Sequence, residues 1–445
     1  MMTRKQYAMR AGVKESTQKE LAFLTGEFIE TIRDPVWKDV LLSAGFKKLY
    51  LSKAMQKLGN IKQLGPVYHL YPGAVHTRLN HSLGVFHVAR LIMLALLQQN
   101  SHQTNATIEF SHEHIMSFLS ACMLHDIGHF PYAHALKELA LKEHEQLARE
   151  IITEDDELKT ILINDIGASV LDVCSIIDSS LPVQSPQIEF FRNLLSGTLD
   201  PDKLDYLNRD AYFCGVPYGT QDVSYITRNL ISIPAGNIAI PLSSIGSVEH
   251  VLFSKYLMYK NVYWHKTTRC ATAMAKKALQ QALSSKVLFQ QDLYDLDDVS
   301  LFALAATIHD FAPFELLRNI EQSKLLEERY VEPFDDHNPV MVDCLSLQSR
   351  QKFENKLFEL LNDRYQELKE HEVIIDIPEA ISFQSDMPVL LPDGNVLPFF
   401  AVDELFTIEV VFSFTTSLRK FRIFTPDYVL SSEVQKAMSS IMETR

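Results

Sequence analysis

The feature of this sequence that most restricts its fold is an ionisable pair at the end of an apolar segment. Apolar residues recur at helical spacing over residues 115–122, and the chain then places His125 and Asp126 side by side before Gly128 interrupts the pattern. An unpaired carboxylate in an apolar environment is strongly unfavourable. The fold must therefore bring partners to this pair from other parts of the chain.

Hydrophobic periodicity predicts a mainly α protein. Val85, Val88, Ile92 and Leu96 recur with the period of a helix. Residues 248–283 contain neither Pro nor Gly, which predicts one long helix or two abutting helices.

The pattern changes after about residue 285. Residues 372–377 and 406–414 predict strands, and the Leu-Pro-Asp-Gly sequence at 391–394 predicts a turn. In the second of these strands the alternation places five apolar residues on one buried face: Phe406, Ile408, Val410, Phe412 and Phe414.

These patterns divide the chain into three parts. We predict an N-terminal arm over residues 1–31, a helical core over 32–285 and a C-terminal α+β region over 286–445. Asp34 and the proline after it predict a turn before the first packed segment.

Composition narrows the class of protein. Hydrophobic residues make up 47% of the 445 residues and charged residues 22%, which is typical of a globular chain. No uninterrupted apolar run approaches the ~20 residues of a membrane helix, and the N-terminus lacks a secretory pattern. The net charge of −14 opposes adhesion to nucleic acid. We therefore expect a soluble, cytoplasmic protein that binds neither membranes nor nucleic acid.

Five cysteines are scattered without CxxC pairs, which predicts free thiols in a reducing compartment. They are expected to fill core positions: Cys122, Cys174, Cys214, Cys270 and Cys344.

Two further segments supply candidate partners for the His-Asp pair. His81 opens another apolar helical segment, and residues 200–210 carry several carboxylates. Taken singly, such a histidine is more often a hydrogen-bonded core residue, and such carboxylates are as often a solvated helix face. Along the sequence a histidine, the His-Asp pair and the carboxylates follow one another, and this combination favours a mixed N/O metal site for Mn, Fe, Co, Ni or Zn. The predicted ligands are His81, His125, Asp126 and Asp202.

The motifs resemble those of the HD-domain phosphohydrolases. Within that family they are most similar to the deoxynucleoside triphosphate (dNTP) triphosphohydrolases related to the sterile-alpha-motif and HD-domain enzyme of animals. The resemblance is carried by residues 61–85, 124–134 and 202–210, with further matches at 144–146 and 263–266.

The resemblance implies a helical HD-domain core and a mononuclear metal site with the four ligands given above. It further implies attack of water on the α-phosphorus of a dNTP, which releases a deoxynucleoside and intact triphosphate. Any Mg²⁺ that takes part is expected to bind the phosphates of the substrate. The 5′-oxygen is a poor leaving group, so a general acid is needed.

For the catalytic groups the resemblance implies Asp126 and three histidines. It places His129 and His144 against the α-phosphate and makes His134 the proton donor. The family has an acid three residues after this donor, whereas this chain has Lys137 with Glu138 beside it. The choice of general acid between His134 and His144 therefore stays open.

For the substrate the resemblance implies two groups of contacts. The triphosphate needs cations, and the matching positions are Arg78, Lys203 and Lys255. Leu64 and Tyr263 would exclude a ribose 2′-hydroxyl, so we expect a preference for deoxyribonucleotides. The remaining sugar contacts are Gln63 and Asp210 at the 3′-hydroxyl and Tyr206 on the sugar face.

Regulation and assembly are expected to differ from the animal enzyme in one respect. That enzyme binds a guanine nucleotide activator through an Asp, a Gln and an Arg, and the matching positions here are Leu51, Gln56 and Gly59. Two of the three contacts are absent, so we expect another nucleotide activator or none. The family resemblance implies a homo-oligomer, either a dimer or a tetramer.

Two other functions compete with this hypothesis. The first is an HD-domain phosphatase or phosphodiesterase acting on a monophosphate, a cyclic nucleotide or an alarmone. The second is a catalytically idle binder of nucleotides or single-stranded nucleic acid. The matches at Gln63, Leu64 and Tyr263 count against the first, and the intact ligand set counts against the second.

Overall fold

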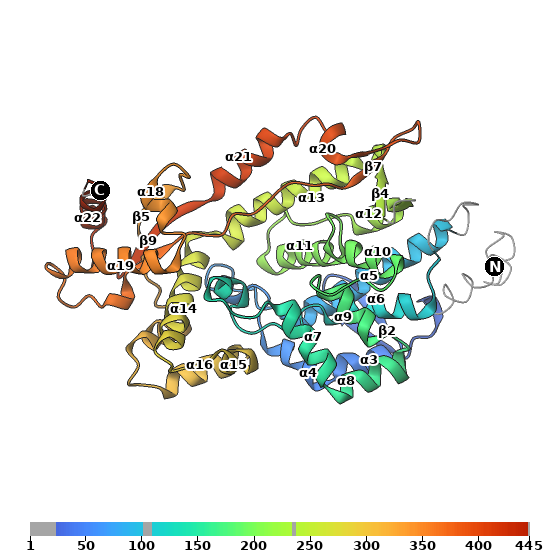
Figure 1. Ribbon diagram of the computed structural model, residues 1–445, viewed down its shortest axis with the longest axis horizontal. Coiled ribbons are helices and arrows are strands. Elements are labelled where there is room, and N and C mark those ends of the chain that lie inside the picture. Colours follow the sequence, from blue (N-terminus) through green and yellow to red (C-terminus); the bar gives the residue numbers. More distant parts are fainter. Residues whose placement is uncertain (1–23, 101–108, 234–236, 444–445) are drawn as a thin grey trace.

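The computed structural model describes residues 24–100, 109–233 and 237–443 and is mainly α, as predicted. Its N-terminal half is a bundle of helices (Figure 1). These helices are α3 (Ala44–Leu51), α4 (Lys53–Lys57), α5 (Arg78–Asn100), α6 (His112–Leu124), α7 (His144–Glu154), α8 (Asp156–Thr160), α9 (Val170–Ile177), α10 (Pro186–Ser196), α11 (Pro201–Cys214) and α12 (Val223–Asn229).

The helical periodicity of the sequence is confirmed in α5 and α6. Residues 115–124 of α6 are all buried, and α5 contributes Val85, Val88 and Ile92 to the same core. The helices are joined by short 3₁₀ or π segments: Leu58–Asn60, Gly65–His69 (η2), Ala133–Leu139 (η3), Ile161–Ile166 and Leu242–Ser244.

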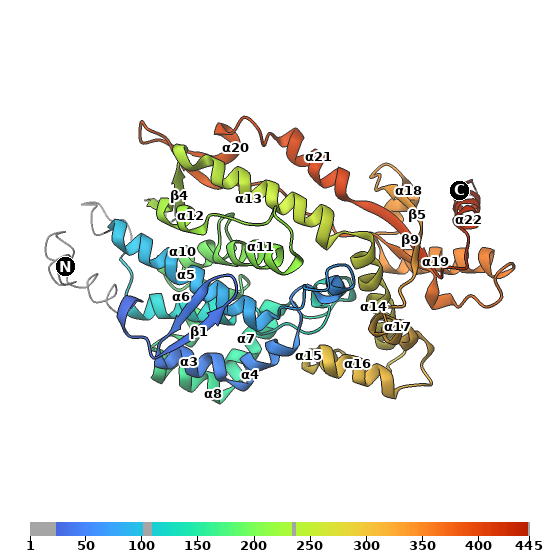
Figure 2. The ribbon, with the colours of Figure 1, turned by 180° about the vertical axis from the view of Figure 1, so that it is seen from behind.

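An antiparallel hairpin precedes the bundle. Strands β1 (Glu30–Asp34) and β2 (Lys38–Leu42) pair around a turn at Asp34 and Pro35, which confirms the predicted turn. Of the expected N-terminal arm, residues 1–23 lie outside the described residues, whereas Leu24 is buried in the core. The hairpin, visible in Figure 2, lies against α5.

The long periodic stretch forms two helices, one of the two predicted alternatives. Helix α13 (Ile245–Met258) runs into a π-helical turn, η6 (Tyr259–Tyr263), and α14 (Lys266–Ser284) follows. Lys255, Tyr259 and Tyr263 belong to the first helical unit and its turn, but Lys266 begins the second helix. On one continuous helix these four residues would share a face. The break after Tyr263 separates Lys266 from the other three.

The C-terminal part is α+β. Its elements are α15 (Gln290–Asp295), α16 (Asp298–Thr307), Ala312–Phe314 in 3₁₀ form, α17 (Glu315–Glu321), β5 (Glu327–Pro333), α18 (Pro339–Asp343), α19 (Leu347–Asn362), Glu370–Glu372 in 3₁₀ form, β6 (Ile374–Asp376), β7 (Pro388–Leu390), β8 (Val396–Pro398), α20 (Phe399–Val402), α21 (Ile408–Leu418), β9 (Lys420–Thr425) and α22 (Ser431–Glu443).

Two sheets organise this region. Strand β9 lies between β5 and β6 in an antiparallel sheet, so the strand predicted at 372–377 is confirmed as β6. The turn predicted at 391–394 is also confirmed, between β7 and β8, and Gly394 adopts a φ of 89° there. Strand β7 also pairs in parallel with β4 (Asn237–Pro241), which in turn pairs with β3 (Ile231–Ile233). The C-terminal chain therefore returns to the N-terminal half.

The strand predicted over residues 406–414 is wrong, because the segment forms helix α21. The hydroxyl of Thr407 accepts a hydrogen bond from the Val410 amide and starts the helix. Val411 and Leu418, seven residues apart, face the core, whereas Ile408 and Phe412 are each 64% exposed. Short apolar runs fit both periods, and here the helical one prevails.

Helix α5 is long and apolar enough, by length and composition alone, to cross a membrane. The candidate span Arg78–Gln99 has a mean hydropathy of 1.4. A search for an uninterrupted apolar run misses this span, because polar residues divide it. Residues 156–166 and 170–177 pass the same test only as a pair bent by 110°. However, 78% of the α5 window is buried inside the protein, as in core helices generally.

All five cysteines are free thiols, as predicted. Cys214 is half-buried and the other four are buried.

Candidate metal centre and active site

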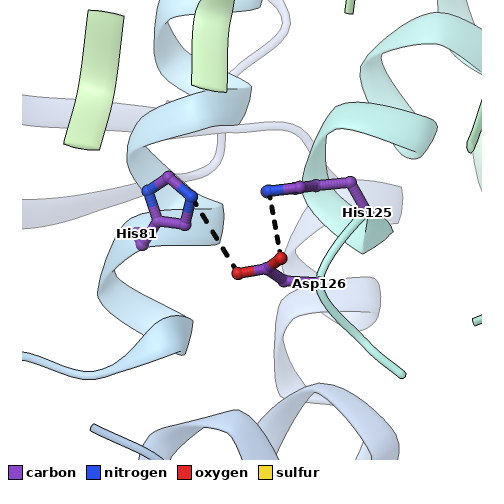
Figure 3. A group of neighbouring side chains, drawn as sticks. All are labelled: His81, His125 and Asp126. Atoms are coloured by element: carbon purple, nitrogen blue, oxygen red, sulfur yellow. Dashed lines mark ion pairs between the residues drawn. The ribbon is translucent and has the colours of Figure 1, made fainter. Parts of the chain in front are cut away.

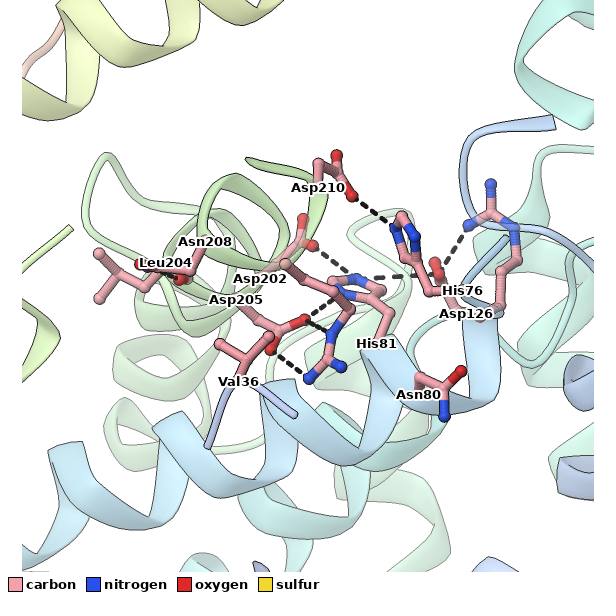
Figure 4. Close-up of polar contacts among 12 residues, drawn as sticks. Val36, His76, Asn80, His81, Asp126, Asp202, Leu204, Asp205, Asn208 and Asp210 are labelled. Atoms are coloured by element: carbon pink, nitrogen blue, oxygen red, sulfur yellow. Dashed lines mark hydrogen bonds and ion pairs between the residues drawn. The ribbon is translucent and has the colours of Figure 1, made fainter. Parts of the chain in front are cut away.

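Three helices bring the four predicted metal ligands to one point. His81 lies in the first turn of α5, His125 and Asp126 follow the end of α6, and Asp202 lies in the first turn of α11. Figure 4 shows His81, Asp126 and Asp202 turned toward one another. Asp202 Oδ1 is 3.0 Å from His81 Nε2 and 3.8 Å from His125 Nε2. Asp126 completes the group, with Oδ2 3.9 Å from His81 Nε2 and Oδ1 3.4 Å from His125 Nε2.

This geometry fits a divalent cation. Ligand atoms bound at about 2.1 Å around one ion lie roughly 3–4 Å apart. His125 Nδ1 lies 2.9 Å from the Cys122 carbonyl oxygen, to which it donates, so the lone pair is on Nε2. That Nε2 atom is buried and has no hydrogen-bond partner among the described residues. Figure 3 shows His81 and His125 turned toward the Asp126 carboxylate between them.

The electrostatics of the group favour positive charge. Burial would lower the pKa of His81, but hydrogen bonds to Asp202 and Asp205 on its two nitrogens outweigh burial and raise it to about 10. Burial would likewise raise the pKa of Asp126. His129, His125 and Arg78 around it hold that pKa well below its usual range. Asp126 is therefore an anionic ligand at neutral pH.

A cluster of three further histidines adjoins Asp126. His129 Nδ1 lies 3.1 Å from Asp126 Oδ1, and His129 Nε2 lies 3.1 Å from His134 Nε2. The His144 ring packs on His129 with centroids 4.0 Å apart. Burial and the Arg78 charge lower the pKa of His129 to about 4, and burial with the His129 ring lowers the pKa values of His134 and His144 as well. The three rings are therefore neutral at pH 7.

Gly128 allows this cluster to form. A Cβ atom at Gly128 would lie 2.1 Å from the His144 carbonyl oxygen and 2.6 Å from the Ala148 amide nitrogen. The loop after Asp126 therefore packs directly on the first turn of α7, which carries His144. Any side chain here would separate His144 from His129.

A cavity of about 450 Å³ opens beside the histidine cluster. Five of the predicted catalytic and substrate residues line it: Gln63, Leu64, Arg78, His134 and Tyr263. The backbone of residues 61–63 pairs with that of 76–78, so that Gln63 lies opposite His76 and Ile61 lies opposite Arg78. Gln63 Oε1 is buried without a hydrogen-bond partner among the described residues. The lining of the cavity therefore includes both an unpaired acceptor, on Gln63, and the guanidinium of Arg78.

The other predicted substrate residues are held by protein groups. Asp210 accepts a hydrogen bond from the Tyr263 hydroxyl at 2.6 Å and contacts His76 Nε2 at 2.8 Å. Tyr206 is half-buried and packs against the hydrophobic core that α5 and α6 form in the helical bundle. The structure does not place Asp210, Tyr206, Lys203 or Lys255 among the residues that line the cavity.

The two predicted lysines lie close to each other. The Lys203 ammonium donates to the Gly197 carbonyl and the Asp200 carboxylate, and the Lys255 ammonium donates to the Ser382 carbonyl at 2.8 Å. Burial and the charge of Lys203 lower the pKa of Lys255 to about 8. Burial would lower the pKa of Lys203, but the carboxylates of Asp200 and Asp202 raise it, so this corner holds two cations and two carboxylates.

Residues 202–210 are not a solvated helix face. Asp205 and Arg209 are 0% exposed and Asp210 is 1% exposed. Sequence reasoning named the carboxylates but assigned no role to Asp205, Arg209, Asp34 or Trp37, which form a buried chain behind His81. The spacing of Asp205 and Arg209 by four residues on one helix was the available signal.

The fold and the site define a helical protein with a buried His/Asp centre suited to a cation. The HD domain matches residues 78–183, and the HD associated region matches residues 222–444. The chain therefore belongs to the HD-domain family.

Three relatives show the range of similarity. An uncharacterised protein of Methanocaldococcus jannaschii is 29% identical over 79% of this chain and 73% of its own length. The uncharacterised protein YwfO of Bacillus subtilis is 30% identical over 68% of this chain and 66% of its own length. The deoxynucleoside triphosphate triphosphohydrolase SAMHD1 of Homo sapiens is a homologue at 24% identity, over 57% of this chain and 45% of its own length.

The fold also occurs in solved structures. The crystal structure of a hypothetical protein from Aquifex aeolicus superimposes with a TM-score of 0.69 at 24% identity, over 93% of this chain and 100% of that one. This similarity extends beyond the HD domain into the C-terminal α+β region. At this level of identity it is a similarity of fold.

Proposed function

We propose that this protein is a metal-dependent dNTP triphosphohydrolase. The observation that carries the proposal is the position of Arg78 and His134. Arg78 donates to Asp126 of the metal centre at 2.6 Å, and His134 contacts the cluster next to it, while both side chains also line the 450 Å³ cavity. A nucleoside in this cavity would have its α-phosphate at the metal centre. The SAMHD1 homologues are named for this activity.

His81, His125, Asp126 and Asp202 would hold the cation, which when bound supplies a Lewis acid and lowers the pKa of water. The set suits Mn, Fe, Co, Ni or Zn. Arg78 donates to a phosphate oxygen, and the neutral His129 ring lies beside it as a second hydrogen-bond donor. His134, which faces the cavity, delivers a proton to the departing 5′-oxygen. The incoming phosphate anion raises the pKa of His134 and so favours the protonated acid.

Choice of sugar gives a testable consequence at Leu64. An apolar wall cannot satisfy an added 2′-hydroxyl, and such a wall gives roughly 10–200-fold discrimination. We expect Leu64→Ala to reduce the ratio of kcat/KM for dGTP over GTP by about tenfold or more. Val75→Ala, an exposed apolar residue outside the cavity, is the matched control and should leave the ratio unchanged. An unaltered ratio in Leu64→Ala would remove this residue from sugar selection.

The lowered pKa of Lys255 predicts a pH dependence of substrate affinity. A lysine is cationic below its pKa, so at a pKa of about 8 its protonated fraction falls about tenfold between pH 7 and pH 9. If Lys255 binds the triphosphate, kcat/KM for dNTP should fall with this profile. In Lys255→Arg the side chain stays charged, and the fall should disappear. Identical profiles for the two proteins would show that Lys255 does not bind the phosphates.

Product analysis tests the proposed function directly. Purified protein loaded with Mn²⁺ is incubated with each dNTP and each ribonucleotide, and the products are resolved by ion-exchange chromatography. Triphosphate together with deoxynucleoside is the expected result. Orthophosphate or pyrophosphate would instead indicate a phosphatase of the HD-domain family acting on another nucleotide. No turnover with any nucleotide, added alone or as an activator, would indicate a binding protein.

Assembly and location are part of the same proposal. We propose a cytoplasmic homo-oligomer, a dimer or a tetramer, which binds dNTP and no membrane or nucleic acid. If an activator is used, the residues at positions 51, 56 and 59 point to a nucleotide other than one bound by the contacts of the animal enzyme.

A further inference from the structure

A buried chain of charged groups lies directly behind His81. His81 Nδ1 is 2.7 Å from Asp205 Oδ2, on the side of the ring opposite to the metal centre (Figure 4). Arg209 holds the Asp205 carboxylate with two parallel hydrogen bonds, each of 2.9 Å. The guanidinium also donates to Asp34 Oδ2 at 2.8 Å. Asp205 and Arg209 are fully buried and Asp34 nearly so, so water does not screen these contacts.

This series of hydrogen-bonded charged groups ends in the N-terminal hairpin. Asp34 is the last residue of β1, and its Oδ1 accepts hydrogen bonds from the amides of Val36 and Trp37 in the turn. The Trp37 indole N–H then donates to Asp205 Oδ1. The turn that closes the hairpin is therefore joined at two points to the carboxylate and guanidinium behind His81.

Gly84 provides the space for this arrangement. It lies on α5, three residues after His81, and a Cβ atom there would lie 1.8 Å from Asp205 Oδ1 and 2.4 Å from Arg209 Nη2. Backbone freedom does not explain a glycine inside a helix, where glycine is less favourable than alanine. Its contribution is the notch in which the carboxylate and the guanidinium sit.

The charges in this chain have a defined effect on His81. One guanidinium between two carboxylates leaves one net negative charge, which Asp205 presents to the imidazole Nδ1–H. Accepting this hydrogen bond keeps a proton on Nδ1, so that Nε2, which faces Asp126 and Asp202, is the nitrogen that would bind a cation, and it makes the imidazole a stronger donor to that cation.

We propose that Asp205, Arg209, Asp34 and Trp37 are positioning residues for the metal ligand His81, so that docking of the β1–β2 hairpin on α5 and α11 sets the affinity of the centre for its cation. The proposal rests on the metal centre proposed above and is independent of the choice of substrate.

The test measures the affinity for Mn²⁺ alone. Full-length protein is stripped with a chelator and titrated calorimetrically with Mn²⁺, and its thermal unfolding is followed without metal. Trp37→Phe keeps the aromatic ring but removes the indole donor to Asp205. Gly84→Ala fills the notch. The control is Arg33→Ala, which removes a solvent-exposed ion pair with Asp39 on the same hairpin.

We expect Trp37→Phe and Gly84→Ala to weaken Mn²⁺ binding about 10–100-fold, the usual effect of losing a group that supports a metal ligand. The metal-free melting temperature of Trp37→Phe should stay near that of the parent, and Arg33→Ala should bind Mn²⁺ as the parent does. If Gly84→Ala does not fold, Trp37→Phe alone decides. Parent-like Mn²⁺ affinity in Trp37→Phe, or an equal loss in Arg33→Ala, would overturn the proposal.

This result is separable from the proposed activity. Weakened Mn²⁺ binding in Trp37→Phe without any dNTP turnover in the parent would support the positioning chain and overturn the substrate assignment. A parent protein that binds no Mn²⁺ would overturn the positioning chain.

Discussion

Asp202→Ala is expected to abolish metal retention and to lower kcat for dNTP hydrolysis by at least about 10³-fold. That factor equals about 4 kcal/mol of transition-state stabilisation, the scale on which a cation acts at a phosphoryl centre. Asp202 is the most informative ligand to remove. Its carboxylate contacts the Nε2 atoms of His81 and His125, and its side chain is 34% exposed, so its loss leaves no unpaired charge in the core. Asp126→Ala, in contrast, would leave Arg78 buried and unpaired.

Asp165→Ala is the matched control for this variant. Its side chain is 26% exposed and pairs with Lys48 at the surface, an interaction worth little. Metal content after dialysis and turnover with saturating Mn²⁺ should separate the two variants completely. If Asp202→Ala retained metal and turned over within tenfold of the parent, the four-ligand centre would be wrong.

The four candidate ligands could be nominated from the sequence because each of them has a local signature. His125 and Asp126 end an apolar helix, His81 begins another, and Asp202 lies one residue after a proline that starts α11. Metal ligands are short-range features of helix ends, so the order of motifs was sufficient to nominate them. Their convergence required only that the three helices pack together.

The series of charged groups behind His81 could not be predicted in the same way. Asp34 and Asp205 are 171 positions apart by number, and no local pattern indicates that Arg209 connects them. A buried carboxylate and a solvated one look alike in a sequence, because burial is decided by packing. Gly84 inside a helical pattern was a second visible sign of a close approach, besides the four-residue spacing of Asp205 and Arg209.

The C-terminal region was harder for a different reason. Over residues 406–414, alternating apolar residues satisfy both the strand and the helical period, and the deciding contacts are tertiary. Tyr256 of α13 stacks on Phe414 with centroids 4.2 Å apart, and α21 lies along α13 (Figure 1). The strand was predicted from residues 406–414 alone, and the sequence of this segment does not reveal its contact with α13.

His134→Ala is expected to give the second largest loss, about 10²–10⁴-fold in kcat with dNTP, because protonation of a poor leaving group contributes a factor of this size. Under the proposed function His134 is the better candidate for the donor, since His134 lines the 450 Å³ cavity and His144 does not. The two histidines otherwise share a cluster, and both pKa values are lowered by burial and neighbouring rings. Loss of activity alone would therefore not separate their roles.

The leaving group separates them. In p-nitrophenyl triphosphate, nitrophenolate takes the place of the nucleoside 5′-oxygen on the α-phosphorus, and its departure needs no proton from the enzyme. A variant that lacks only the general acid should hydrolyse this ester nearly as fast as the parent, while a variant that lacks a phosphate contact should lose both activities equally. We expect the first result for His134→Ala and the second for His144→Ala. The reverse pattern would move the acid to His144 and place the leaving oxygen on the α7 side of the centre.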